Sequence, residues 1–138
     1  MCPDTKALLA YVKSELFFAA ICYYIKINPK PITAMAKKIA EQLIDTLVKS
    51  GVERIYAVTG DSLNEVNEAV RKNDQIKWIH VRHEETGAYA AAAEAQLTGR
   101  PGCCAGSSGP GHVHLINGLY DAHRSGAPVI AIASTIPT

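Results

Sequence analysis

The stretch RIYAVTGDSL, residues 54–63, decides the fold of this chain. Its first half, Arg54 to Val58, is rich in β-branched and aromatic residues and predicts a short strand. A polar turn from Thr59 to Ser62 follows. Ser62 and Glu65 have the S-x-x-E spacing of a capping box, which predicts a helix from there to about Val70. The unit is therefore strand, turn and helix.

The same alternation recurs along the chain. The further predicted elements are strands at 76–81, 102–105 and 128–133 and helices at 39–48, 83–97 and 112–124. Continuous apolar strands that alternate with helices predict an α/β fold, a doubly wound parallel sheet with helices on both faces. Because the sequence stops just after a strand, we expect this sheet to be incomplete.

Composition excludes several classes of protein. Of the 138 residues, 48% are hydrophobic and 20% charged, so neither a disordered nor a collagenous chain is expected. The net charge of +1 gives no electrostatic basis for binding nucleic acid or an anionic membrane. The four cysteines lack metal-binding spacing, which favours reduced thiols in a cytoplasmic protein.

The first 34 residues differ in character from the rest. They hold five of the nine aromatic residues, while all ten glycines lie at or after Gly51. The uncharged run from Leu16 to Ile25 is ten residues long, whereas a membrane-spanning helix needs about 20. A secretory signal fits poorly because Asp4 and Glu15 spoil its charge asymmetry. An extra N-terminal helix, or a leader upstream of a true start at Met35, explains the segment better.

Ligands of open α/β sheets bind beyond the carboxyl ends of the strands, so the loops there are the candidate site. The loop GSSGPG, 106–111, places glycines before a helix, where backbone approaches a ligand closely or simply turns tightly. It is neither a Walker A motif nor G-x-G-x-x-G. Glu84 and Glu85 begin a helix about 100° apart, so only one is expected to face the cleft; both could equally serve to stabilise the helix start.

Metal ligation by histidine is not expected. His112, His114 and His123 lack the H-E-x-x-H arrangement, and no nearby cysteine or carboxylate in the sequence completes a zinc set. A nucleophile elbow is also absent, because Ser107 and Ser108 do not stand in G-x-S-x-G. The sequence therefore predicts no metal ligand in this chain.

Five segments occur in a telling order: VTGDSLN at 58–64, RHEE at 82–85, AEAQLTG at 93–99, GSSGPG at 106–111 and HLINGLYDA at 114–122. Together they resemble the N-terminal pyrimidine-binding domain of thiamine-diphosphate-dependent enzymes. The resemblance covers 35–138 and leaves 1–34 unmatched, and within the superfamily it is strongest to pyruvate oxidases and quinone-dependent pyruvate dehydrogenases. It implies an oxidative decarboxylation of pyruvate or another 2-oxo acid.

The resemblance also implies roles for matching residues. Glu84 matches the glutamate that hydrogen-bonds N1′ of the cofactor's aminopyrimidine and so promotes loss of the thiazolium C2 proton, which makes it the implied catalytic residue. His114 matches a position that is histidine in pyruvate oxidases and commonly asparagine in acetolactate synthases. The other implied cofactor-binding residues are Thr59, Gly60, Asp61, Gly109, Pro110 and Gly111. Thr135 falls near a common glutamine of relatives, which weakens any contact there.

The family further implies parts that this sequence lacks. Magnesium and the diphosphate are held by a G-D-G…N motif in a later domain, and the oxidases add an FAD domain; neither appears here. The family's site forms between subunits, so a homo-oligomer, dimer or tetramer, is implied, with negligible turnover by this chain alone. Membrane contact is implied only through regions absent here. Two alternatives stay open: a fragment of an acetolactate synthase-type enzyme, and a non-catalytic module that needs a diphosphate-binding partner.

Overall fold

The computed structural model describes residues 36–135. The chain divides after Ala36 into two units, and the description that follows concerns the second, which begins at Lys37. The interpretations of residues 1–34, including those of Cys2 and Cys22, lie outside the described residues.

One four-stranded sheet organises this unit. Its strands are β1 (Arg54–Ala57), β2 (Lys77–His80), β3 (Gly102–Gly106) and β4 (Val129–Ala133). They lie side by side in the order β2-β1-β3-β4, and every neighbouring pair is parallel. The predicted parallel α/β fold is confirmed.

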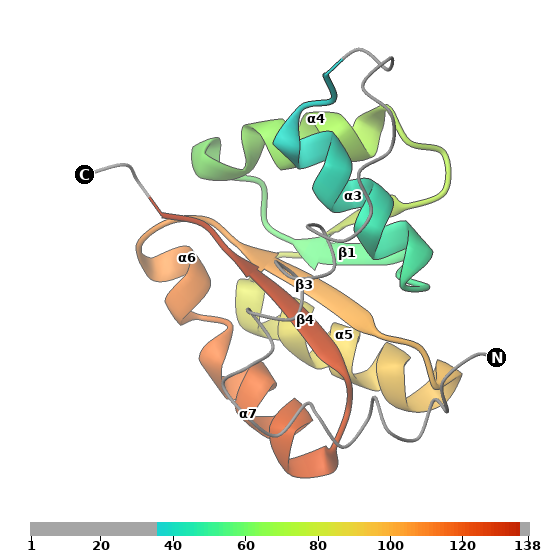
Figure 1. Cartoon of the computed structure of the whole chain (residues 1–138). Coiled ribbons are helices and arrows are strands. Elements are labelled where there is room, and N and C mark those ends of the chain that lie inside the picture. Colours follow the sequence, from blue (N-terminus) through green and yellow to red (C-terminus); the bar gives the residue numbers. More distant parts are fainter. Residues whose placement is uncertain (1–35, 136–138) are drawn as a thin grey trace, which may run out of the picture. The chain divides into compact units, whose positions relative to one another are not determined.

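Helices cover the sheet on both faces (Figure 1). Helices α3 (Ile39–Lys49) and α4 (Asn64–Arg71) pack together on one face, and α5 (Glu84–Thr98) and α7 (Ile116–Ser125) pack together on the other. A single turn, α6 (Pro110–Val113), precedes α7. The arrangement has three layers, as the alternation of strands and helices in the sequence predicts.

The central strand β3 shows how both faces acquire a core. All five of its residues are buried, and its side chains alternate between the two faces. Cys103 packs with Ile44, Ile55 and other residues beneath α3 and α4, whereas Cys104 packs with Ala91 and Leu115 beneath α5 and α7. Both cysteines are free thiols.

Small residues bring α5 unusually close to its neighbours. Its buried face is made largely of alanine, and a Cβ at Gly102 of β3 would lie 2.1 Å from the carbonyl oxygen of Ala91. A Cβ at Gly118 of α7 would lie 2.5 Å from the Cβ of Ala88. The alanine-rich stretch therefore serves close packing, and this packing fixes the start of α5 relative to β3 and α7.

The structure corrects two local predictions. The Ser62–Glu65 capping box does not form: residues Asp61–Leu63 make a 3-10 turn, α4 begins at Asn64, and the Ser62 hydroxyl instead bonds other loops. Glu65 pairs with Lys38 of the segment before α3. The predicted helix at 112–124 is divided into α6 and α7 by a turn at His114 and Leu115.

None of the helices among residues 36–135 is both long and apolar enough to cross a lipid bilayer.

Candidate functional site

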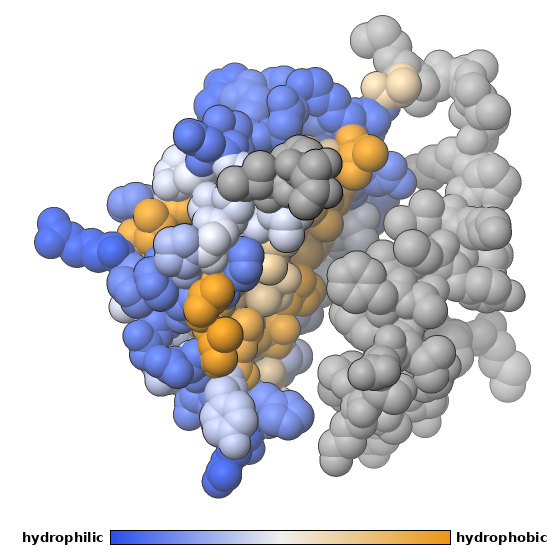
Figure 2. All heavy atoms as spheres, turned by 90° about the vertical axis from the view of Figure 1, so that its left-hand side faces the viewer, coloured by the Kyte–Doolittle hydropathy of each residue, from blue (hydrophilic) through white to orange (hydrophobic). Residues whose placement is uncertain are grey.

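The polar loops gather at one edge of the sheet, because the four strands are parallel and their carboxyl ends coincide. Figure 2 views the molecule from the side on which β4 ends and shows a band of apolar residues between more polar areas. The exposed large apolar side chains of the described residues include Val113, Ile116 and Tyr120 of the α6–α7 segment. The candidate site thus combines polar loops with an apolar border.

Glu84 is the central residue of this edge. It is the first residue of α5 and is only 9% exposed, and no other charged residue among 36–135 is as buried. A buried carboxylate is costly unless positive charge or hydrogen-bond donors compensate it. The amino end of the α5 helix carries partial positive charge and favours an anion at this position. Glu85, the next residue, is more exposed, so one glutamate alone turns inward, as predicted.

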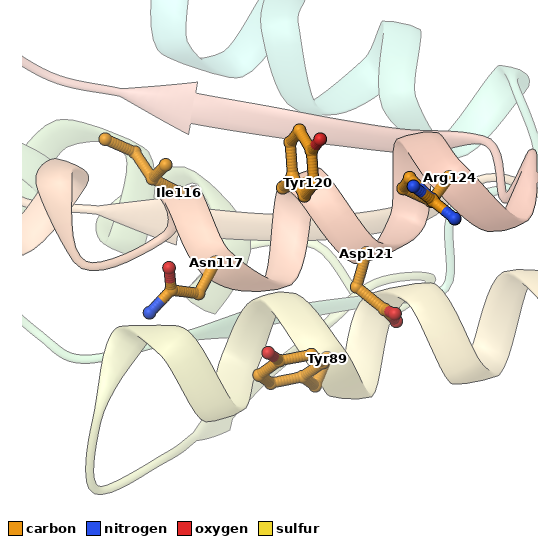
Figure 3. Close-up of a pocket in the computed structure, with 6 residues that line it drawn as sticks. All are labelled: Tyr89, Ile116, Asn117, Tyr120, Asp121 and Arg124. Atoms are coloured by element: carbon orange, nitrogen blue, oxygen red, sulfur yellow. The ribbon is translucent and has the colours of Figure 1, made fainter.

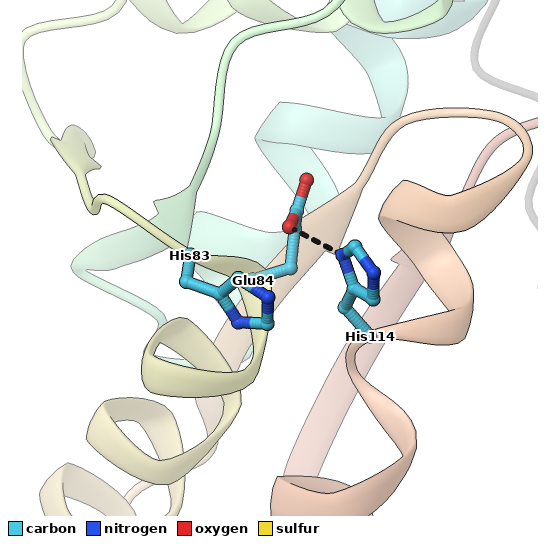
Figure 4. Close-up of side chains that lie close together, drawn as sticks. All are labelled: His83, Glu84 and His114. Carbon is cyan, nitrogen blue, oxygen red and sulfur yellow. Dashed lines mark hydrogen bonds and ion pairs between the residues drawn. The ribbon is translucent and has the colours of Figure 1, made fainter.

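Two histidines flank the Glu84 carboxylate (Figure 4). Nδ1 of His114, in the turn between α6 and α7, lies 3.1 Å from Oε2 of Glu84. The imidazole rings of His83 and His114 stack with centroids 4.6 Å apart and planes inclined by 27°. One potential ligand atom from each of these three side chains lies within 4.8 Å of those from the other two.

The glycine turn, residues 106–111, contacts Glu84 with its backbone rather than with side chains. Gly109 has φ of 74° and ψ of −127°, a conformation that glycine adopts readily, and it allows Pro110 to begin α6. A Cβ at Gly111 would lie 3.2 Å from Oε1 of Glu84. The peptide backbone therefore comes directly against the carboxylate, and both Gly109 and Pro110 are exposed at the rim of the site.

The loop after β1, residues 59–62, contacts the glycine turn, residues 106–111, through Ser107. A Cβ at Gly60 would lie 2.3 Å from the hydroxyl oxygen of Ser107, and a Cβ at Gly111 would lie 3.3 Å from its Cβ. Thr59 and Asp61, on either side of Gly60, are exposed. The structure thus brings the predicted residues Glu84, Gly111 and His114 together and joins Gly60 to them through Ser107.

The hydroxyls of Ser62, Ser107 and Ser134, which we call the serine set, connect three loops. The hydroxyl of Ser62 accepts the backbone N–H of Ser108 at 2.9 Å and lies 2.9 Å from the hydroxyl of Ser107 and 2.7 Å from that of Ser134. Ser134 in turn donates its hydroxyl to the carbonyl oxygen of Gly106 at 3.1 Å. Ser62 can therefore accept from Ser107 and donate to Ser134, which satisfies every hydroxyl in the set.

A pocket lies next to the start of α5, on the outer side of α5 and α7 (Figure 3). It is lined by Tyr89, Ile116, Asn117, Tyr120, Asp121 and Arg124. Asn117 also donates to Oε1 of Glu85 at 3.2 Å, so this pocket borders the second, more exposed glutamate. The side chains of Glu84 and Glu85 therefore contact different parts of the structure, Glu84 at the sheet edge and Glu85 beside this pocket.

Sequence reasoning missed the serine set and the stacked histidines. Ser62 has the spacing of a helix cap in the sequence, and His83 alone carries no signal of a partner there. The sequence presents His112 only as a candidate metal ligand, whereas its Nδ1 lies 3.1 Å from the carbonyl oxygen of Ser134. The available signal was positional, because each of these residues follows the carboxyl end of a strand.

Comparison with known proteins identifies the domain. The family model described as "Thiamine pyrophosphate enzyme, N-terminal TPP binding domain" matches residues 37–138. The chain is 52% identical over 104 residues to YdaP of Bacillus subtilis, 47% over 97 residues to pyruvate oxidase of Lactiplantibacillus plantarum, and 36% over 101 residues to acetolactate synthase 3 of Brassica napus. These matches take in 74%, 70% and 73% of this chain but only 18%, 16% and 16% of the respective relatives.

Proposed function

The chain belongs to the thiamine pyrophosphate enzymes, whose N-terminal TPP-binding domain it contains, and on that premise we propose that it serves an enzyme that oxidatively decarboxylates pyruvate. In this proposal Glu84 is the catalytic carboxylate. The observation that carries it is the burial of Glu84 at the amino end of α5, against the backbone of Gly111.

The residues present fit the aminopyrimidine end of thiamine diphosphate. A mostly buried carboxylate is a strong acceptor for a ring N–H, and the glycine backbone at Gly60 and Gly111 leaves no side chain to obstruct a flat ring. Bound thiamine diphosphate supplies an electron sink for cleavage next to the carbonyl of a 2-oxo acid. The residues proposed to hold its pyrimidine end are Thr59, Gly60, Asp61, Glu84, Gly109, Pro110, Gly111 and His114.

The proposal gives separate tasks to Glu84, His114 and the serine set. Glu84 would hold the pyrimidine through a hydrogen bond at N1′ and would keep a proton at that nitrogen. The imidazole of His114, 3.1 Å from Oε2 of Glu84, orients the carboxylate. The serine set keeps the loops after β1, β3 and β4 in fixed relation, so the backbone that surrounds the pyrimidine is preorganised.

The preference for pyruvate oxidation over acetolactate synthesis has two supports. The chain is more similar to the pyruvate oxidase of Lactiplantibacillus plantarum than to the acetolactate synthase of Brassica napus, at 47% against 36% identity. His114 also matches the histidine that the resemblance associates with oxidases. An acetolactate synthase-type enzyme stays the second candidate because its identity of 36% extends over a similar length, 101 residues.

The remaining parts of the enzyme are proposed to lie outside this chain. We assign the diphosphate, magnesium and FAD to further domains, with the complete site formed between subunits of a dimer or tetramer. Val113, Ile116 and Tyr120 are exposed beside the site and suit such a subunit contact. The free thiols of Cys103 and Cys104 support a cytoplasmic location.

The test uses the native polypeptide that contains the segment Arg82–Glu85, whose intact mass is measured first. A mass several times 14.8 kDa supports the proposal, and a mass near 14.8 kDa supports a separate module that needs a partner subunit. Copurification of a subunit with a G-D-G…N motif would then identify that partner. Acetate as the product from pyruvate supports the oxidase, whereas acetolactate supports the second candidate.

The role of Glu84 is tested by E84Q in the complete enzyme, with E85Q as the matched control. Exchange of the C2 proton of bound thiamine diphosphate, followed by proton NMR, is expected to slow by about 10²–10⁴-fold in E84Q, the usual contribution of a positioned acid or base. E85Q is expected to exchange at the parent rate, because its side chain is bonded to Asn117 instead. Equal rates in E84Q and the parent protein would overturn the assignment.

A further inference from the structure

The fold assembles three potential metal ligands that are not recognisable in the sequence. His83 and Glu84 are consecutive at the start of α5, and His114 is brought to them by the turn between α6 and α7 (Figure 4). One ligand atom from each residue lies within 4.8 Å of those from the other two. In the sequence His114 stands near His112 and His123, and nothing there links it to His83 or Glu84.

The chemistry of the set suits a transition metal. Two imidazoles and one carboxylate form a donor set used by Zn²⁺ and related first-row divalent ions. Magnesium and calcium prefer oxygen ligands and are disfavoured by two nitrogen donors. Three protein ligands also leave a fourth tetrahedral position open to water or another ligand.

The geometry requires the side chains to close around the ion. Tetrahedral coordination at zinc–ligand distances of about 2.0–2.2 Å places the donor atoms about 3.3–3.6 Å from one another. The pair His114 Nδ1 and Glu84 Oε2 is already at 3.1 Å, and the remaining donor lies within 4.8 Å, so side-chain rotation has to bring it nearer. The side chains of His83 and His114 are 48% and 42% exposed, so both rings have room to turn.

The surroundings decide which charges a cation meets. The amino end of α5 is unfavourable to a cation, but the Glu84 carboxylate offsets it. A carboxylate oxygen of Glu85 lies 3.9 Å from Nδ1 of His83 and adds negative charge. Nδ1 of His83 accepts the backbone N–H of Glu85 at 3.3 Å, a long hydrogen bond.

We propose that His83, Glu84 and His114 bind a first-row divalent transition-metal ion such as Zn²⁺. The ion binds the Glu84 carboxylate, which in the proposed function is hydrogen-bonded to the pyrimidine of thiamine diphosphate. Metal and cofactor therefore exclude each other at Glu84. This second statement rests on the proposed function, whereas the metal site itself does not.

The test measures metal binding by the 138-residue chain in the absence of thiamine diphosphate. Zn²⁺ affinity is measured by calorimetry, and Co²⁺ serves as a spectroscopic probe because a tetrahedral site gives intense visible absorption. H83A and H114A are each expected to weaken Zn²⁺ binding at least about tenfold, since even outer-shell partners of a metal contribute 10–100-fold. H123A, which removes an exposed histidine of α7 outside the set, is the matched control.

The Co²⁺ spectra and Zn²⁺ affinities of the variants distinguish a metal site at these three residues from the absence of one. Loss of the Co²⁺ absorption in H83A and H114A, but not in H123A, supports the site, provided that circular dichroism shows all variants folded. Equal Zn²⁺ affinity in H83A, H114A and the parent chain overturns it, as does a Co²⁺ spectrum typical of the hydrated ion. Because no cofactor is present, that failure would leave the proposed function standing.

Discussion

Gly60 and Ser107 follow different strands, yet they approach so closely that a Cβ at Gly60 would lie 2.3 Å from the Ser107 hydroxyl oxygen and 2.5 Å from its Cβ. The contact joins the loop after β1 to the glycine turn after β3. Gly60 has an extended backbone, with φ of −152°, so this crowding rather than conformational strain is what requires glycine there.

The substitution Gly60→Ala is therefore expected to destabilise the fold by about 1–3 kcal/mol, the usual cost of overpacking. Denaturant unfolding of the chain measures the loss. The double variant Gly60→Ala with Ser107→Gly removes both crowded atoms and should recover part of it. If Gly60→Ala alone is as stable as the parent, the close contact does not exist in solution.

A second prediction concerns the serine set. Ser62→Ala removes the acceptor of the Ser108 N–H and the link to Ser134, so we expect a loss of about 1–3 kcal/mol in the free energy of unfolding. Ser50→Ala is the matched control, because the Ser50 hydroxyl bonds only the carbonyl of Thr46 on an exposed helix end. A similar small loss in both variants would show that the loops are held by other contacts.

The buried thiols give a third prediction. Burial raises the pKa of Cys104 to about 12 and also raises the pKa of Cys103, so neither is a thiolate near neutral pH. Iodoacetamide is expected to leave both unmodified in the native chain and to modify both after denaturation. Peptide mass spectrometry reads the two sites directly. Rapid labelling of the native chain would mean that β3 opens readily.

A fourth prediction concerns acid titration of α4. A hydrogen bond from Arg71, followed by the charges of Arg71 and Lys72, holds the pKa of the Glu68 carboxyl at about 2. Because this pKa is lowered on folding, its contribution to stability is present above about pH 4.3, the ordinary glutamate pKa, and is lost as the pH falls toward 2.

NMR titration of the Glu68 carboxyl carbon tests this, and Arg71→Gln should raise its pKa toward the ordinary value. Arg124→Gln, on the opposite side of the sheet, should leave it unchanged. An ordinary pKa for Glu68 in the parent chain would show that the exposed Glu68–Arg71 pair does not persist in solution.

The sheet was predictable because the patterns that encode it are local. Apolar strands such as Pro128 to Ala133 and the stop at Gly99 are visible in the sequence, and Gly99 indeed ends α5 in the left-handed conformation, with φ of 68°. Because parallel strands have their carboxyl ends at the same edge of the sheet, the position of the loops that follow them could be predicted without knowing any tertiary contact.

The missed features depend on tertiary contacts. Ser62 fits a capping box by spacing, but hydroxyls of Ser107 and Ser134 compete for it, and these lie 45 and 72 residues away. The helix predicted at 112–124 breaks at His114, where the turn lets the imidazole reach Glu84. The periodicity of the sequence predicts neither the contacts of Ser62 nor the contact between His114 and Glu84.

Peptide backbone lies against Glu84 at Gly111, and the loops at this edge are packed so closely at Gly60 and Gly106 that added side chains would collide with their neighbours. Peptide groups are the same whatever residue carries them, so selection has little to vary there. Substitutions that change the chemistry of this edge without a steric collision therefore fall on side chains such as His83 and His114, whereas the proposed role of Glu84 fixes that position.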